Sequence, residues 1–229
     1  MTGTMDSSIY NILLTLPLFQ GLTKSEFGEI IEKVRFDFST VEDGVTFIRA
    51  GEPCGGFVFL LNGSVVSRRA SNDGRFVISE TVNAPAMIEV HSMSGLLPVF
   101  VKDYTSCGNV GVLRFDKQYL YSELYKYDIC RMNLLNMLSG RIQTLESDMW
   151  KLRGGSLRER IVRLVAGLCD LSSGPKEVRV KMDDLSEILC ETRLNVSRAL
   201  NALADERKIV LRRGGFDVPS MERLIMEIE

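Results

Sequence analysis

The sequence has a single histidine, His91, and five cysteines that are scattered along 229 residues without a CxxC pair. One histidine excludes a His-rich metal centre, and the cysteine pattern argues against a disulfide scaffold or a Cys-rich zinc site. No apolar run approaches the ~18 residues of a membrane span, and no charged start precedes an apolar signal core. We therefore expect a cytoplasmic protein with no metal and no membrane partner.

Catalytic motifs are missing as well. There is no Gly-Lys pair, which excludes a phosphate-binding P-loop. The string from Val90 to Gly95 fails the GxSxG pattern because position 90 is Val. We therefore expect no enzyme activity. The net charge of −2 argues neither for nor against nucleic acid, so a DNA-binding role would depend on where the arginines lie.

The chain begins with helical patterns and continues with strand patterns. Residues 7–34 predict short helices. From about 35 to 116, short apolar strings alternate with Gly-bearing turns, of which Asn62-Gly63 and Asn72-Asp73-Gly74 are typical of hairpins. Turns spaced roughly ten residues apart predict a compact antiparallel barrel or roll.

A third pattern covers residues 117–153, where apolar side chains step by three and four as in an a/d seam. Such a seam predicts a helix that pairs with a second copy in a homodimer, but a helix docked on its own barrel gives the same spacing. Two glycines, Gly154 and Gly155, follow the seam and predict a helix end and a hinge. The seam consists of Leu135, Leu138, Ile142, Leu145, Met149 and Leu152.

Residues 183–204 contain two helical patterns separated by the short turn Cys190-Glu191-Thr192. Thr192 is placed to cap the second helix, whose positive start is then able to meet a phosphate. In a DNA groove arginine pairs with guanine, asparagine pairs with adenine, and serine contacts phosphate or base edges. The first turns of the second helix offer these side chains at Arg193, Asn195, Ser197 and Arg198.

A basic hairpin is predicted next, over Ile209–Val218. Its Gly214-Gly215 pair favours a tight two-residue turn, which would place Arg212 and Arg213 against a sugar–phosphate backbone. The alternative is a small solvated helical domain whose arginines serve solubility. The order of helix, turn, capped helix and basic hairpin favours DNA.

The segment Met182–Leu203, with Thr192–Leu200 at its centre, resembles the helix-turn-helix of the Crp/Fnr transcription regulators. Leu16–Leu22 resembles the N-terminal segment of that family, and Gly51–Gly63 resembles its β-roll core. The seam resembles its dimer helix. The resemblance covers nearly the whole chain, and the order of the four pieces is more specific than any one of them.

The resemblance implies an α+β fold in three parts. These are an antiparallel, cyclic-nucleotide-binding-like β-roll effector domain at 1–116, a dimerisation helix at 117–153 and a winged helix-turn-helix at 154–229. The resemblance also implies a homodimer that binds palindromic double-stranded DNA, with RNA polymerase as a further partner. An effector bound to the roll would shift the long helix about the glycine hinge and reorient the DNA-binding domains.

The DNA contacts are implied by position in the family's recognition helix. The two arginines of that helix would read bases or phosphates, and its threonine and serine would contact phosphate. Many family members have an acidic residue where this chain has Leu194, and leucine contacts a thymine methyl rather than cytosine, so the usual half-site is not expected. The implied contacts are Thr192, Arg193, Leu194, Asn195, Ser197 and Arg198.

The effector site departs from the family's cyclic-nucleotide cassette, which is a Gly-Glu pair followed further along by an arginine. Glu89 stands where the glutamate belongs, but Ile88 precedes it. No arginine lies between Arg75 and Arg114. A buried phosphate without a guanidinium loses its main charge-assisted contact, so we expect no cyclic nucleotide in the usual mode.

The effector is therefore expected to be an unidentified small molecule, and any cofactor is unknown. Lys102 would replace the missing arginine only if it points inward, and a haem role for His91 competes with that of an ordinary side chain. The segment 84–101 either lines an apolar pocket or fills the core. The pocket candidates are Glu89, His91, Phe100 and Lys102. The alternative for the whole chain is a ligand-binding or protein-interaction module that no longer reads DNA.

Overall fold

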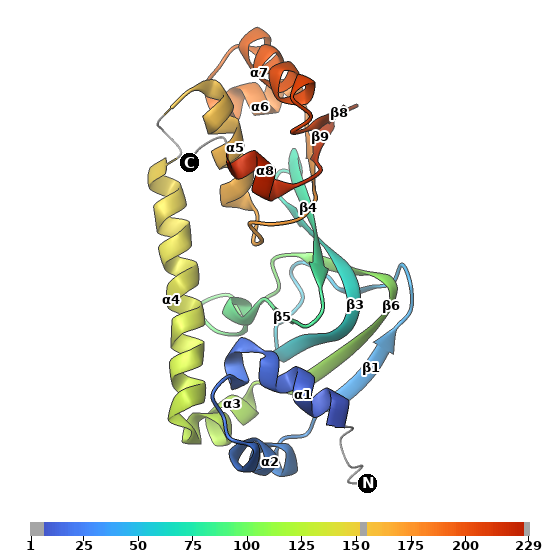
Figure 1. Ribbon diagram of the computed structural model, residues 1–229, viewed down its shortest axis with the longest axis vertical. Helices are drawn as coiled ribbons and strands as arrows, with labels where there is room; N and C mark the ends of the chain where they lie inside the picture. The colour runs from blue at the N-terminus through green and yellow to red at the C-terminus, as the bar shows by residue number, and fades with distance from the viewer. Residues whose placement is uncertain (1–6, 152–154, 227–229) are drawn as a thin grey trace. The chain divides into compact units, whose positions relative to one another are not determined.

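The computed structural model describes residues 7–151 and 155–226, which form two compact units (Figure 1). The first unit consists of the chain up to Val66 together with Val82–Ile142. The second unit consists of Ser67–Thr81 and the chain from Gln143 onward. Residues 67–81 therefore belong to a unit whose other residues lie far along the sequence. The functional division at residues 116 and 153 stays a prediction.

The long helix is shorter than the segment that predicts it. It begins at Asp128 rather than at 117, because two short helical turns first bury Leu120 and Leu124 in the core of the first unit. The helical elements up to this point are α1 (Ser7–Thr15), a 3-10 turn (Pro17–Phe19), α2 (Lys24–Lys33), a 3-10 turn (Val90–Met93), α3 (Gln118–Ser122), a 3-10 turn (Leu124–Lys126) and α4 (Asp128–Lys151).

The strands before residue 117 pair in antiparallel fashion, and the parts of them that fall within residues 67–81 belong to the second unit. They are β1 (Asp37–Val41), β2 (Thr46–Ile48), β3 (Gly56–Ala70), β4 (Phe76–Asn83), β5 (Ala86–Ile88) and β6 (Asp103–Asp116). The long strand β6 pairs with both β1 and β2, and β5 pairs with β3. Asp37 of β1 lies directly opposite Arg114 of β6. The predicted α+β class with an antiparallel sheet is confirmed.

One of the two predicted hairpins is wrong. β3 runs without a break through Asn62-Gly63, whereas the turn at 72–74 does join β3 to β4. Gly63 has a φ of +79°, and a Cβ there would lie 2.8 Å from the carbonyl oxygen of Asn109 in β6. The Asn62 Oδ1 accepts a hydrogen bond from the Gly111 N–H at 2.9 Å. The pair thus serves the close approach of two strands, a use of glycine that local sequence does not distinguish from a turn.

Aromatic rings fill the core of the first unit. The ring centroids of Phe57 and Phe115 lie 4.6 Å apart, and Phe59 lies 5.6 Å from Phe115. Phe19 comes from the N-terminal 3-10 turn and stacks 5.9 Å from Phe59. Pairs at such distances contribute roughly 0.5–1.5 kcal/mol beyond the area that they bury. The rings therefore hold the N-terminal segment against strands β3 and β6.

The second unit takes one of its strands from the distant hairpin. β4 pairs with β7 from Phe76 opposite Val180 to Glu80 opposite Lys176, β7 pairs with β9, and β9 pairs with β8. Phe76 and Ile78 of this hairpin also belong to the apolar core of the unit. The remaining elements are α5 (Leu157–Leu168), β7 (Lys176–Val180), α6 (Met182–Leu189), α7 (Arg193–Asp205), β8 (Val210–Arg212), β9 (Gly215–Val218) and α8 (Met221–Ile225).

A buried ion pair joins β4 to β7. The Lys176 Nζ lies 3.1 Å from the Glu80 Oε1, and the two side chains are 0% and 1% exposed. The Glu80 carboxylate also accepts hydrogen bonds from the N–H groups of Asp170 and Leu171, both at 3.0 Å. The Lys176 Nζ donates to the Ser173 carbonyl at 2.7 Å. Buried charges are tolerated only with such partners, so the network fixes the register of the hairpin on the second unit.

We expect Lys176→Met to lower the free energy of unfolding of the second unit by about 3–5 kcal/mol, because it leaves a buried carboxylate without its cation. The matched control is Arg179→Met in the same strand, which breaks an exposed ion pair of 2.6 Å with Glu177. That change is expected to stay within about 0.5 kcal/mol. Urea unfolding followed by circular dichroism measures both, and equal losses would contradict the role of the buried pair.

Candidate nucleic-acid interface and effector pocket

Helices α6 and α7 and the turn between them form the predicted helix pair. α6 ends at Leu189, and Cys190 adopts a left-handed φ of +51° that redirects the chain. The Thr192 Oγ1 accepts a hydrogen bond from the Asn195 N–H at 3.2 Å, so the predicted cap is confirmed. The apolar side of α7 lies in the core of the second unit through Val196, Leu200 and Leu203.

The predicted DNA-contacting residues of α7 lie on its outer side. Arg193, Asn195 and Arg198 are exposed, Ser197 is half-buried, and Leu194 is 58% exposed. A leucine this exposed contributes little to the core of its own unit. The outer side of α7 thus offers two cations, an amide, a hydroxyl and one apolar side chain to a partner, which is the chemistry that base edges and phosphates require.

The exposed cation and amide are held by weak local contacts. The Arg193 Nε lies 3.1 Å from an Asp183 carboxylate oxygen, with the two side chains 67% and 70% exposed. The Asn195 amide donates to Glu191 at 3.3 Å, which lowers the pKa of that carboxyl. Exposed ion pairs contribute about 0–1 kcal/mol, so a phosphate or a base can replace these partners at little cost.

The basic hairpin forms, but its turn is displaced by one residue from the prediction. Arg212 pairs with Gly215 across β8 and β9, so the two turn residues are Arg213 and Gly214. Gly215 lies inside the sheet, where a Cβ would come within 2.0 Å of the Val178 carbonyl oxygen. The Arg212 Nε is bound to Asp217 at 2.8 Å, and Arg213 is exposed at the turn.

The seam residues divide between two sides of α4. Leu138 packs against the core of the first unit together with the buried Leu134, as expected for a helix docked on its own roll. Leu135 and Ile142 are 57% and 63% exposed, and Leu145 is exposed as well. The side chain of Met149 and all of Leu152 lie outside the described residues. Both interpretations of the seam thus have apolar side chains to support them, and the homodimer stays a prediction.

The predicted hinge, Gly154 and Gly155, borders the internal stretch that the structure does not describe. Gly154 is outside the described residues, and Gly155 has a left-handed φ of +91°. Ser156 caps α5 by accepting a hydrogen bond from the Glu159 N–H at 3.3 Å. The helix start after the glycines is therefore well defined, and the hinge role itself stays a prediction.

The predicted effector residues differ in burial and in hydrogen-bond partners, and their role stays a prediction. The Glu89 carboxylate is buried and accepts hydrogen bonds from the Ser92 hydroxyl at 2.7 Å, the Val101 N–H at 2.8 Å and the Tyr104 hydroxyl at 3.2 Å. His91 is exposed, and Lys102 is 2% exposed. Protein groups thus occupy the carboxylate that the family's cassette would offer to a ribose.

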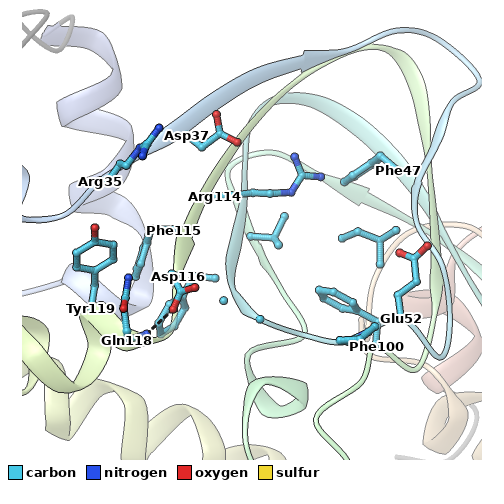
Figure 2. A pocket seen from close by; sticks show the side chains of 16 residues that line it. Arg35, Asp37, Phe47, Glu52, Phe100, Arg114, Phe115, Asp116, Gln118 and Tyr119 are labelled. Carbon is cyan, nitrogen blue, oxygen red and sulfur yellow. Dashed lines mark hydrogen bonds between the residues drawn. The ribbon is translucent and has the colours of Figure 1, made fainter. Parts of the chain in front are cut away.

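A cavity of the first unit lies elsewhere in the roll (Figure 2) and measures about 520 Å³. Of the four effector candidates only Phe100 lines it. Sequence reasoning missed its polar lining, above all Arg114, Asp37 and Gln118. The available signal was the position of Arg114, a charged residue within the apolar string Val110–Phe115.

Within residues 7–151 and 155–226, none of the helices has both the length and the hydropathy of a membrane-spanning segment. No family model matches the sequence, and no curated protein does either. Solved structures match over nearly the full length. The catabolite activator protein of Thermus thermophilus is 19% identical, with 93% of this chain and 97% of that chain covered and a TM-score of 0.51.

A protein described as a transcriptional regulator of the Crp/Fnr family from Eubacterium rectale is 14% identical, with 92% of this chain and 96% of that chain covered and a TM-score of 0.52. Identities this low show the fold and not the activity. The chain has the fold of the Crp/Fnr regulators, which confirms the resemblance noted from the sequence.

We expect Glu89→Ala to lower the free energy of unfolding of the first unit by about 3–5 kcal/mol, because it leaves buried donors without an acceptor. The control is Glu52→Ala, whose exposed carboxylate accepts one hydrogen bond from the Arg49 N–H at 3.1 Å. The control is expected to lose less than about 1 kcal/mol. If denaturant midpoints show Glu89→Ala to be as stable as the control, its carboxylate is not structural.

Proposed function

We propose that the protein is a homodimeric, sequence-specific DNA-binding transcription regulator whose roll senses a small effector. The observation that carries the proposal is the capped helix α7, whose inner side is core and whose outer side presents Arg193, Asn195 and Arg198. The β8–β9 hairpin of the same unit adds further exposed arginines. The fold shared with a catabolite activator protein and with a protein described as a Crp/Fnr regulator supports it. RNA polymerase is the further partner that this resemblance suggests.

The effector is not a cyclic nucleotide bound in the family's usual mode. Two observations support this part of the proposal. The Glu89 carboxylate is engaged by donors of the roll itself, and no arginine lies between Arg75 and Arg114 to hold a cyclic phosphate. Millimolar or weaker binding of cAMP and cGMP in calorimetry is the expected result, and micromolar affinity would overturn this part alone.

Selection from a random duplex pool tests DNA reading, and we expect enrichment of a two-fold symmetric site. Arg193→Ala combined with Arg198→Ala is expected to cost about 2–6 kcal/mol on that site, a loss of roughly 30-fold or more, because each arginine contact with a base is worth about 1–3 kcal/mol. Arg179→Ala, an exposed arginine on β7 of the same unit, is the control and is expected to retain affinity. Gel shifts at several salt concentrations measure all three proteins.

The contrary result is the absence of any enriched symmetric site, or equal affinity of the double variant and the control. A salt-independent interaction would favour the alternative of a module that no longer reads DNA, since phosphate contacts make protein–DNA affinity fall with salt.

The homodimer is tested at the exposed side of α4. We expect Ile142→Asp to weaken dimerisation about 100-fold or more, because a two-fold axis would bury the new carboxylate twice in an apolar contact. Val45→Asp replaces another exposed, branched aliphatic side chain outside this helix and serves as the control. Sedimentation velocity over a concentration series gives the dissociation constants. A wild-type monomer at micromolar concentration, or an Ile142→Asp protein that dimerises like the control, would disprove the seam contact.

A further inference from the structure

The cavity of Figure 2 is separate from the cassette position, since neither Glu89 nor Lys102 lines it. Its walls come from β1, β2, β6, the start of β3 and the first residues of α3. At about 520 Å³ it falls within the range of small-molecule sites. These residues have no part in the proposed DNA contacts.

Arg114 is a charged group of the cavity with few hydrogen-bond partners in the protein. Its guanidinium is half-buried, which lowers its pKa, and lies 5.6 Å from the centre of the Phe47 ring. It donates one hydrogen bond of 3.3 Å to the Ser39 hydroxyl. Among the described residues it forms no ion pair with a carboxylate. A carboxylate matches the guanidinium fork with two parallel hydrogen bonds and is the ligand group best suited to it.

Asp37 supplies the opposite charge beside it. Asp37 stands directly across from Arg114 in the β1–β6 register, and directly opposed residues have Cβ atoms about 4.5–5.5 Å apart on one face of the sheet. Figure 2 shows both side chains at the cavity, and the Asp37 carboxylate is exposed without a hydrogen bond to the described residues. It therefore remains available to a cationic group of a ligand.

The other charges of the lining are less available. The Asp116 carboxylate accepts a hydrogen bond from the Gln118 N–H at 2.7 Å, drawn as the dashed line in Figure 2, and Glu52 accepts one from the Arg49 N–H. Arg35 is exposed at the side of the cavity. Arg114 and Asp37, which lie directly opposite each other in the β1–β6 register, thus form no ion pair with the other described residues and can be matched by a ligand.

The floor beside this charge pair is apolar. Phe47, Phe57, Phe100 and Phe115 line the cavity together with Ile48 and Val58. Aromatic and branched side chains at a floor favour a ligand with an apolar body, because burying apolar area is favourable by roughly 25 cal/mol per Å².

We propose that this cavity binds a free α-amino acid with an apolar or aromatic side chain. The ligand carboxylate binds Arg114, its ammonium group binds Asp37, and its side chain lies against the phenylalanine floor. This inference specifies the effector of the proposed function. It depends on that function only for the effect of ligand binding on DNA affinity. Binding itself stands on the geometry of the first unit alone.

Titration calorimetry on the full chain with L-phenylalanine and L-leucine tests the proposal. We expect saturable binding of at least one of them. 3-Phenylpropanoate, which lacks the ammonium group, and 2-phenylethylamine, which lacks the carboxylate, are expected to bind at least about 10-fold more weakly than L-phenylalanine, since each leaves one charge unmatched.

Single substitutions test which charged group of the ligand each side chain binds. Arg114→Gln is expected to weaken binding of the amino acid at least about 10-fold and to leave the affinity for 2-phenylethylamine unchanged. Asp37→Asn is expected to weaken binding of the amino acid by a similar factor and to leave the affinity for 3-phenylpropanoate unchanged or higher. Arg35→Gln, at the solvated side, is the matched control and is expected to stay within about twofold. Unfolding midpoints of the variants confirm that each protein is folded before its affinity is compared.

Two results would overturn the inference: no saturable binding of either amino acid up to about 10 mM, or equal affinity of L-phenylalanine and 3-phenylpropanoate. The inference and the proposed function fail separately. Amino-acid binding without any enriched DNA site leaves the cavity assignment in place and removes the regulator. An enriched site without amino-acid binding does the reverse.

Discussion

The buried ion pair between Glu80 and Lys176 is the contact on which the second unit depends. Neither charge reaches water, so each must be fully hydrogen-bonded, and backbone groups of residues 170–173 complete the network. The pair fixes β4 against β7, and β7 in turn carries the β8–β9 hairpin. The hairpin that carries Arg212 and Arg213 thus belongs to a sheet that a distant segment of the chain completes.

The contrast between buried and exposed charge explains how the candidate interface remains available. The Glu80–Lys176 pair is costly to break, whereas the pair of Arg193 with Asp183 is open to solvent on both sides. A phosphate can therefore replace Asp183 at little cost. The apolar inner side of α7 holds the helix in place, so its outer polar side is free to serve recognition rather than stability.

In the first unit the charged groups differ in burial and in hydrogen bonding. Glu89 is engaged by donors of the roll and stabilises the fold, although its sequence position suggests a ligand site. Arg114 and Asp37 line a cavity with an aromatic floor and have few protein partners. Burial and hydrogen bonding, rather than residue type, separate the structural carboxylate from the groups that a ligand can reach.

The sequence alone determined what depends on neighbours along the chain. The α+β class, the helix pair and the cap at Thr192 were predictable, since periodicity and capping involve residues only a few positions apart. Tertiary structure decided the rest, because it depends on segments far apart in sequence. Gly63 and Gly215 permit another strand to approach rather than form turns, and Arg114 meets Asp37 only through the pairing of β1 with β6. The partnership of β4 with β7 likewise arises only when the chain has folded, since no local pattern encodes which strand a sheet edge will accept.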